Sequence, residues 1–477
     1  MLGRALAYAG IMACLTMSSA VASSIVNLKS QAPEGIDISF QLTDGRVLGQ
    51  SFNEQHWYIL TPDNTGSYVN GTWTRAADLP ANYAPYAFSS AVLADGRVIV
   101  QGGEYNFGNF SLTKHGEVYN PTKNSWSKLD PPPGWHFIGD SGAIVLADGR
   151  YVVLAKLNRD LAALDPSTMT WTELANAGKN DFNSEEGPVL LPDGSFVVVD
   201  VKDAPKAERY FPSQGLWESA GKTPVSLKGP PCCQCVNYGK NGHKCYHPPG
   251  ETGPAVLRPD GTVFAAGALP ATGPAHTAVY NPTRNKWTAG PDFPSGDDAG
   301  DNFASLLPNG NVLVQGNSGS AYEFDGSKLV KQSVCTCGES LMVLPTGEVL
   351  LGGDAVYRAS GTYKAAWQPQ VQNFPSTVSR GSSYSISGTQ FNGLSQANGF
   401  GDELMTYTNY PLVRITNNST GHVFYARTHD HSSMGVATGN LTVSTTFDVP
   451  SGMETGASKL EVVANGIPSP AVSITVN

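Results

Sequence analysis

The chain has 477 residues, of which 40% are hydrophobic and 15% are charged, and its formal net charge is −10. This acidic balance argues against nucleic acid or an anionic membrane surface as a partner, because both repel negative charge. The length, with 52 glycines and 33 prolines, indicates a turn-rich all-β protein of about two domains.

Residues 1–22 have the composition of a signal peptide. Arg4 is their only charged residue, an apolar run follows it, and Ala20-Val21-Ala22 fits a small-x-small cleavage site. A membrane anchor is the alternative, but the apolar run is short and ends in small residues. No later stretch is apolar enough to span a bilayer. The sequence therefore predicts a secreted or periplasmic protein without a membrane span.

Residues 23–35 are predicted to be a linker with a strand at Ser24–Lys29 that closes the repeat domain after it. That domain repeats one pattern, seen best at Ala91–Trp126, in which two apolar runs flank the turn Asp95-Gly96. Asp-Gly between apolar runs predicts a β-hairpin whose two central residues both have positive φ. Turn glycines recur along the chain at Gly45, Gly96, Gly149, Gly194, Gly261, Gly310 and Gly347.

Four copies of the repeat carry a tryptophan seven residues after a tyrosine or leucine. The pairs are Tyr119 with Trp126, Leu164 with Trp171, Tyr210 with Trp217 and Tyr280 with Trp287. A repeat of about fifty residues that contains a hairpin, an aromatic residue and a Trp is typical of a propeller blade. Residues 36–369 are thus predicted to form a seven-bladed β-propeller, which resembles the kelch-repeat propellers.

A Cys-rich insertion at 221–249 interrupts the repeat. It holds four of the six cysteines that lie outside the signal peptide. The six are Cys232, Cys233, Cys235, Cys245, Cys335 and Cys337. An even number in an exported chain predicts disulfides, with cross-links between the insertion and Cys335-Thr336-Cys337. A thiolate metal site that includes His243 and His247 is the alternative.

Residues 370–477 lack the repeat and contain short alternating stretches separated by polar turns. The stretches are Ser383–Gly388, Leu412–Ile415, Val423–Ala426, Thr445–Val449, Lys459–Val463 and Val472–Val476. Regular short strands of this kind predict an immunoglobulin-like β-sandwich. The fold expected for the whole chain is all-β, with the propeller followed by the sandwich.

Parts of this C-terminal region resemble the C-terminal domain of galactose oxidase and glyoxal oxidase. The resemblance rests on Val423–His429, Met434, Thr446–Pro450 and Val462–Ser469. It implies a kelch-type seven-bladed propeller and a sandwich, one loop of which brings a histidine ligand to copper at the propeller axis. By position that role falls on His429, with His431 beside it. Without the resemblance, the residues favour a hydrogen-bonded loop that packs the sandwich against the propeller.

The chain departs from the copper-radical ligand set of these oxidases. The family has a Tyr-His pair just before the last blade's first hairpin, where this chain has Cys337-Gly338. The family's cross-linked tyrosine would fall within 267–270, a stretch without Tyr. A copper site without these phenolate and imidazole ligands lacks its usual coordination. We therefore do not expect oxidation of galactose or glyoxal by a tyrosyl radical.

Carboxylates recur at one position of the repeat, just before the first hairpin. Asp140, Glu185 and Asp301 lie nine residues before a turn glycine, and Glu251 lies ten before one. Because a propeller brings equivalent blade positions together, we expect these side chains at one mouth of the axis, approached by the loop that carries His429. The expected ligand-binding set is Asp140, Glu185, Glu186, Glu251, Asp301 and Glu339, with His429 and His431 as candidate metal ligands.

Like charges held this close are costly unless they bind a cation or cationic ligand, or some of them stay protonated. Each carboxylate taken alone is explained as well by a cap on a backbone amide or by solvation. Two functions stay open. One is an exported binding or structural propeller whose acidic mouth takes a cation, a carbohydrate or another small molecule. The other is an oxidoreductase of the copper-oxidase architecture with altered ligands, so a divalent cation and copper both remain candidate cofactors.

Overall fold

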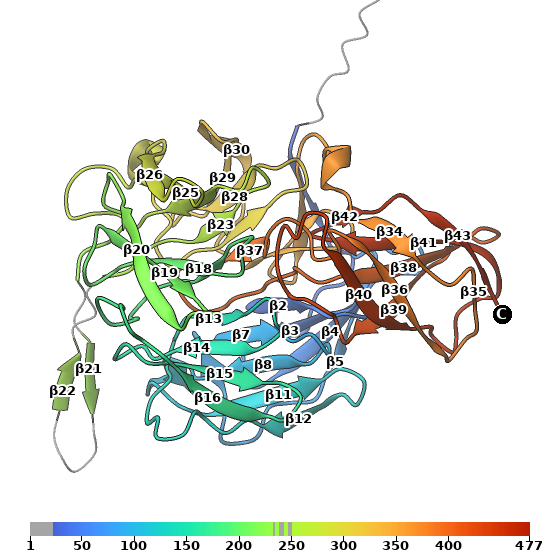
Figure 1. Ribbon diagram of the computed structural model, residues 1–477, viewed down its shortest axis with the longest axis horizontal. Coiled ribbons are helices and arrows are strands. Elements are labelled where there is room, and N and C mark those ends of the chain that lie inside the picture. The colour runs from blue at the N-terminus through green and yellow to red at the C-terminus, as the bar shows by residue number, and fades with distance from the viewer. Residues whose placement is uncertain (1–21, 232–233, 238–242, 247–249) are drawn as a thin grey trace, which may run out of the picture.

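The computed structural model describes residues 22–231, 234–237, 243–246 and 250–477 of an all-β chain (Figure 1). The predicted signal peptide up to residue 21 lies outside these residues, as do Cys232 and Cys233. Helical structure in the described part is limited to two 3-10 turns, η2 (Pro294–Gly296) and η3 (Ala365–Trp367). None of its helices is long and apolar enough to cross a membrane.

Small antiparallel sheets of four strands follow one another along the first two thirds of the chain. The first is formed by β2 (Ile38–Gln41), β3 (Val47–Gln50), β4 (Trp57–Thr61) and β5 (Thr72–Arg75). The second is formed by β7 (Ser89–Val92), β8 (Val98–Gln101), β11 (Gly116–Asn120) and β12 (Ser125–Lys128). The third is formed by β13 (Ala143–Val145), β14 (Tyr151–Leu154), β15 (Leu161–Asp165) and β16 (Thr170–Leu174).

The series continues with four more sheets, and the Cys-rich insertion separates the fourth sheet from the fifth. The fourth sheet contains β17 (Val189–Leu190), β18 (Phe196–Val199), β19 (Lys206–Phe211) and β20 (Leu216–Lys222). The fifth contains β23 (Ala255–Leu257), β24 (Val263–Ala266), β25 (Thr277–Asn281) and β26 (Lys286–Ala289). The sixth contains β27 (Ala304–Leu306), β28 (Val312–Gln315), β29 (Ser320–Phe324) and β30 (Leu329–Cys335). The last contains β31 (Leu341–Val343), β32 (Val349–Leu351) and β33 (Ala355–Arg358), to which the N-terminal β1 (Ser24–Asn27) adds an antiparallel edge.

The sheets are arranged in a propeller-like manner (Figure 1). First strands of different sheets contact one another: β7 with β13, β17 with β23, β23 with β27, β27 with β31, and β31 with β2. The first two strands of a sheet are buried on both faces, as in β7 and β8, whereas a fourth strand such as β5 is mostly exposed. Burial on both faces explains why first and second strands are continuous apolar runs rather than alternating ones.

Two features of the repeat have a direct structural cause. The constant offset of seven residues arises because each aromatic or leucine residue pairs directly with its tryptophan across the third and fourth strands. The turn prediction was wrong in one respect. Gly96 has φ +84°, but Asp95 is not in the left-handed region, and the Gly96 amide donates to the Leu93 carbonyl. The hairpin is therefore a type I turn followed by a left-handed glycine rather than a two-residue type I′ turn.

The C-terminal region folds into one large curled sheet with its own apolar core. Its strands are β34 (Gln370–Asn373), β35 (Thr377–Val378), β36 (Ser383–Thr389), β38 (Leu412–Asn417), β39 (Val423–His429), β40 (Thr442–Asp448), β41 (Gly456–Ala464), β42 (Ile467–Pro468) and β43 (Val472–Val476). The end of β39 rests on hairpin turns of the first two sheets, since the Thr428 amide donates to Thr43 and the Arg427 guanidinium donates to the Asp95 carbonyl.

One segment of the C-terminal region, 391–411, runs into the middle of the small sheets, and we call it the central segment. Its residues are buried throughout, apart from a half-buried Leu394. Within it β37 (Asn398–Gly399) pairs with β27, and the Leu404 amide donates to the Phe88 carbonyl (Figure 1). This segment therefore fills the space between the first strands, which face one another.

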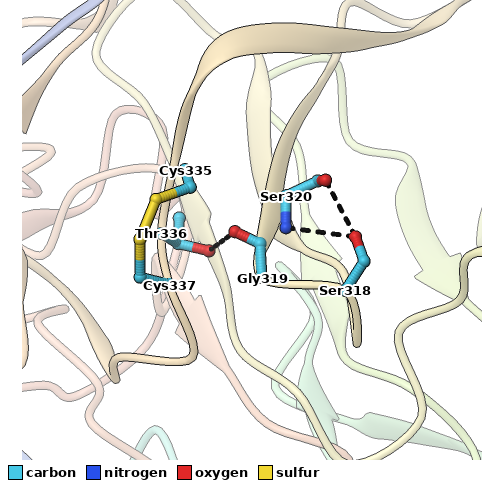
Figure 2. The surroundings of a disulfide bond; sticks show 6 residues. All are labelled: Ser318, Gly319, Ser320, Cys335, Thr336 and Cys337. Atoms are coloured by element: carbon cyan, nitrogen blue, oxygen red, sulfur yellow. Dashed lines mark hydrogen bonds between the residues drawn. A yellow bond between two sulfur atoms is a disulfide. The ribbon is translucent and has the colours of Figure 1, made fainter.

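Two smaller sheets and a disulfide complete the described structure. The small sheets are β6 (Pro85–Tyr86) with β9 (Tyr105–Asn106) and β10 (Asn109–Phe110), and β21 (Gln234–Asn237) with β22 (His243–Tyr246). Figure 2 shows the disulfide, which joins Cys335 at the end of β30 to Cys337. The expected cross-link from these two cysteines to the insertion is therefore wrong, because they pair with each other. In the insertion, Cys235 lies opposite Cys245 in the strand register.

Candidate binding site in the central cavity

A cavity of about 310 Å³ lies where the tip of the central segment meets the starts of the first strands. We call it the central cavity. Its lining is dominated by carboxylates, namely Asp37, Glu104, Asp140, Glu185, Glu251, Asp301, Asp402 and Glu403. Aromatic rings complete the walls, from Tyr86, Tyr105, Phe303 and Phe400. Of the described residues that line it, none is Lys, Arg, His or Cys. The cavity is thus strongly acidic.

The structure brings four of the predicted carboxylates together here. Asp140, Glu185, Glu251 and Asp301 each precede the first strand of their sheet, and all four line the cavity. Glu186 and Glu339 do not line the cavity. The Glu339 side chain is half-buried beside Gly352, although its neighbours Gly338 and Ser340 contribute to the lining.

Sequence reasoning missed the carboxylates that the central segment supplies. Asp402 and Glu403 stand at its tip and are 2% and 5% exposed. The segment passes very close to the fourth sheet: a Cβ atom on Gly187 would lie 2.3 Å from the Gly401 carbonyl oxygen. The sequence offered one signal for these residues, an acidic pair within a long stretch rich in Gly and Asn. The stretch has no periodicity, so nothing in it predicted a position at the centre of the small sheets.

A buried lysine partly balances these charges. Lys156, which follows β14, reaches Asp140 and lies 2.6 Å from the Glu185 carboxylate. Asp140, Glu185 and Asp402 each offer an oxygen within 4.8 Å of the other two. Among the described residues, the second oxygen of Asp140 and the Oδ2 atom of Asp402 find no hydrogen-bond partner. The site therefore has more buried carboxylate oxygens than donors to satisfy them.

The pKa values of these groups reflect that imbalance. Burial, followed by the nearby carboxylates, raises the pKa of Asp402 and of Asp301 well above the usual range. Burial also raises the pKa of Glu403 to about 7 and that of Asp37 to about 7. Glu185 differs: burial opposes its charge, yet the Lys156 ammonium holds its pKa below the ordinary value. Near neutral pH the negative charge of the cavity is therefore neutralised only if the carboxylates bind protons or a cation.

Glu186 does not share the cavity with Glu185, and its buried side chain bonds to Lys179 beside the fourth sheet. There Lys179 donates to Asp181, Glu186 and Glu208 over 2.9, 2.9 and 2.7 Å. Asp200 completes this group, and every member is less than 9% exposed. We call these five residues the sealed cluster. Burial raises the pKa of Glu186 well above its usual range and that of Asp200 to about 8.

The predicted metal ligands His429 and His431 lie elsewhere. His429 ends β39 and bonds to Asp430, the next residue, and to Asp448 at the end of β40. His431 is buried, with Nδ1 bonded to Thr445 and its ring stacked on Tyr410. Burial lowers the pKa of His431 to about 3. The expectation that this loop approaches the carboxylates is wrong, because the central segment occupies that position and the His429 loop rests on the hairpin turns at the other end of the sheets.

Exposed apolar side chains gather at the same end of the sheets as the cavity. Eight large hydrophobic side chains are exposed among the described residues. Five belong to connections that either follow a second strand or precede a first strand, and so lie at the end of the sheets where the cavity is found: Phe52, Tyr86, Phe107, Phe182 and Leu269. Aromatic groups around an acidic pocket are typical of a surface that binds a ligand.

Copper, which the resemblance implies, does not fit this cavity. Copper sites in proteins use imidazole or sulfur ligands, and none of the described lining residues provides either. Cys337 is held in the disulfide and Gly338 has no side chain, so the two residues at the position of the family's Tyr-His pair cannot replace it.

Comparisons with known proteins identify similar folds but no family. No family model and no curated protein matches the sequence. A fungal alcohol oxidase of the AA5 family in complex with copper is 14% identical, with TM-score 0.49, over 95% of this chain and 98% of that chain. A catalytically inactive virginiamycin B lyase from Staphylococcus aureus with quinupristin is 9% identical, with TM-score 0.49, over 70% of this chain and 98% of that chain. At such identities the likeness concerns the fold and says nothing about activity.

Proposed function

We propose that the chain is an exported binding module and that its central cavity binds a small, positively charged organic ligand. One observation carries this proposal. Eight carboxylates line the cavity, none of its described lining residues is cationic, and one buried oxygen of Asp402 has no hydrogen-bond partner in the described part of the chain. A buried carboxylate without a partner raises the free energy of the folded protein. A cation that binds in the cavity pairs with this carboxylate and removes that cost.

The proposal includes the finer architecture. We infer that the small sheets are the seven blades of a kelch-type propeller spanning 36–369, closed by β1, and that 370–477 is an immunoglobulin-like sandwich. The contacts between first strands and the pairing of β1 with β33 support this reading. The signal peptide predicted at 1–22 supports export to a secreted or periplasmic location. A propeller collects equivalent positions of its blades at one mouth, which is the usual place for a ligand.

The dimensions and walls of the cavity favour a molecule over a bare ion. Its volume of about 310 Å³ is at the lower end of the range of about 300–1,000 Å³ for small-molecule pockets. An ammonium group suits the floor, because the Lys156 ammonium already lies between Asp140 and Glu185 in this manner. Phe303 and Phe400, whose ring centroids are 4.7 Å apart, offer aromatic faces to a cation.

Within this class we propose an amino sugar as the ligand. Carboxylates accept hydrogen bonds from hydroxyl groups as well as from an ammonium, and the exposed aromatic side chains around the mouth suit the flat apolar faces of further sugar units. The copper-dependent alternative is not our proposal, because no described residue of the cavity lining offers an imidazole or a thiolate. A divalent cation in the cavity is retained only as an outcome of the test.

Calorimetric titration of the purified mature protein tests the proposal. A trimer of glucosamine is expected to bind at neutral pH, whereas the fully N-acetylated trimer, which has no charge, is expected to bind at least about tenfold more weakly. The double variant D402N/E403Q should weaken binding of the charged trimer by about 100-fold. Asp78→Asn, an exposed carboxylate near the same face, is the matched control and should bind normally. Equal binding of the two trimers, or binding of Ca²⁺ alone, would overturn the amino-sugar assignment.

A further inference from the structure

We propose a second cation site, beside the fourth sheet, in which Asp181, Glu186 and Asp200 of the sealed cluster bind one divalent metal ion. Ca²⁺ is the ion that best matches their chemistry. This site is separate from the central cavity and does not depend on the function proposed for it. Its role is structural, because all three residues are buried.

The positions of the ligand atoms fit a single ion. Each of the three carboxylates offers one oxygen, and these oxygens all lie within 4.8 Å of one another. Ca²⁺ binds oxygen at about 2.3–2.6 Å, so oxygens up to about 5 Å apart reach the same ion. The donor set contains only oxygen, which selects a hard cation such as Ca²⁺ over zinc or copper.

Asp200 gives independent evidence for a bound ligand, because the described part of the protein does not satisfy its carboxylate. Its side chain is 0% exposed, and neither of its carboxylate oxygens has a hydrogen-bond partner among the described residues. It stands directly after β18, and its oxygen faces those of Asp181 and Glu186. Buried carboxylates in folded proteins are otherwise paired, hydrogen-bonded or bound to a metal.

The other members of the cluster are held in place for this role. The Asp203 amide donates to Asp181 Oδ2 and the Val201 amide donates to Glu186 Oε1, so the backbone fixes both carboxylates. Lys179 bonds to Asp181, Glu186 and Glu208 but not to Asp200. Four carboxylates around one ammonium leave three negative charges in excess, and a divalent ion reduces that excess to one.

The proposed ion would join two stretches that are separate in sequence, 179–186 and 200–208. The first of these stretches also carries Glu185, which lines the central cavity. We therefore expect the ion to fix the chain on which Glu185 stands, so that loss of the ion loosens one wall of the cavity.

The test uses the whole mature protein, unfolded in a chelator and refolded with or without Ca²⁺. Elemental analysis should find one Ca²⁺ per chain at this site, and the melting temperature should rise by about 3 °C or more at saturating Ca²⁺. Asp200→Asn should abolish both effects. Two controls should retain them: Glu218→Gln, an exposed carboxylate on β20 of the same sheet, and Asp402→Asn in the central cavity.

Tb³⁺ gives a readout that does not depend on stability. The Lys179 ammonium lies 5.2 Å from the Trp217 ring, so Tb³⁺ bound in the cluster should emit when tryptophan is excited. The emission should persist in Asp402→Asn and vanish in Asp200→Asn. If Asp200→Asn does not fold, Asp181→Asn serves with the same readouts. Retention of Ca²⁺ and emission in these cluster variants, or a wild-type melting temperature that saturating Ca²⁺ does not raise, would overturn the proposal.

Discussion

Two acidic groups lie on either side of one peptide bond. Glu185 belongs to the group around Lys156 that lines the central cavity, and Glu186 belongs to the sealed cluster around Lys179. Each group places three buried carboxylates within 4.8 Å of one another, and each contains one lysine. They differ in their surroundings, because the first group lines the central cavity and no residue of the sealed cluster does. The same charges can therefore recruit an exchangeable ligand in one place and retain a structural ion in the other.

The lysines should reveal this difference most strongly. Replacement of Lys179 by Met leaves the carboxylates of the sealed cluster without their ammonium, and we expect a loss of about 3–5 kcal/mol in the free energy of unfolding. Lys156→Met should lower the free energy of unfolding clearly less, because Asp140 and Glu185 border a cavity that admits water or a cation. Urea denaturation of both variants measures the difference. Equal losses would show that access does not distinguish the two groups.

The second test is the pH dependence of binding in the central cavity. The pKa of Glu403 is about 7, and it faces Asp402, Glu185 and Lys156; the pKa of Asp37 is also about 7. Both side chains gain charge as the pH rises from 5 to 8, so the affinity for a cation should rise by about tenfold. The probe is 1,5-diaminopentane, whose charge does not change in this range.

Stability of the ligand-free protein should change in the opposite direction. A carboxyl whose folded pKa is raised contributes stability below its unfolded pKa of about 4 and loses that contribution as the pH rises through about 7. The urea midpoint should therefore fall between pH 5 and 8 without ligand and fall less with ligand. In D402N/E403Q the affinity should depend on pH less steeply than in the wild type, because Glu403 is lost and Asp37 still titrates. A wild-type affinity that is flat across this range would contradict the proposed role of these carboxylates.

The smallest effect is expected from the disulfide. Cys335–Cys337 closes a loop with a sequence separation of only two residues, so its loss should cost about 1–2 kcal/mol or less. The disulfide adjoins Gly338 in the cavity lining. The double variant C335S/C337S should therefore weaken binding of 1,5-diaminopentane modestly. It should leave the Ca²⁺-dependent rise in melting temperature unchanged. A lost Ca²⁺ effect would mean that the two acidic groups are not independent.

Repetition is what made part of this site predictable. Asp140, Glu185 and Asp301 lie nine residues before their turn glycines and Glu251 lies ten before its own, and nearly equal offsets in repeated sheets lead to one place. The constant spacing to Trp126, Trp171, Trp217 and Trp287 likewise followed from direct cross-strand pairing. The all-β character and the small sheets could be predicted from these patterns.

The rest of the site comes from residues that no repeat relates. Asp402 and Glu403 belong to an irregular segment whose path is set by close packing against Gly187, and Lys156 follows a strand in only one sheet. Glu186 was assigned to the cavity because it adjoins Glu185, yet the turn at 184–185 separates the two side chains, and Glu186 bonds to Lys179 of the sealed cluster. The resemblance to the copper oxidases suggested that the His429 loop reaches the centre, whereas the central segment does so here.

A crystal structure of the mature protein grown with Ca²⁺ and the glucosamine trimer tests the central claim most directly. We predict an amino group within hydrogen-bonding distance of Asp402 or Glu403, and one Ca²⁺ bound by Asp181, Glu186 and Asp200. Anomalous scattering from the metal distinguishes the two occupants. Ca²⁺ in the central cavity with the sealed cluster empty, or the sugar bound away from the acidic mouth, would contradict the division between an open ligand site and a sealed ion site.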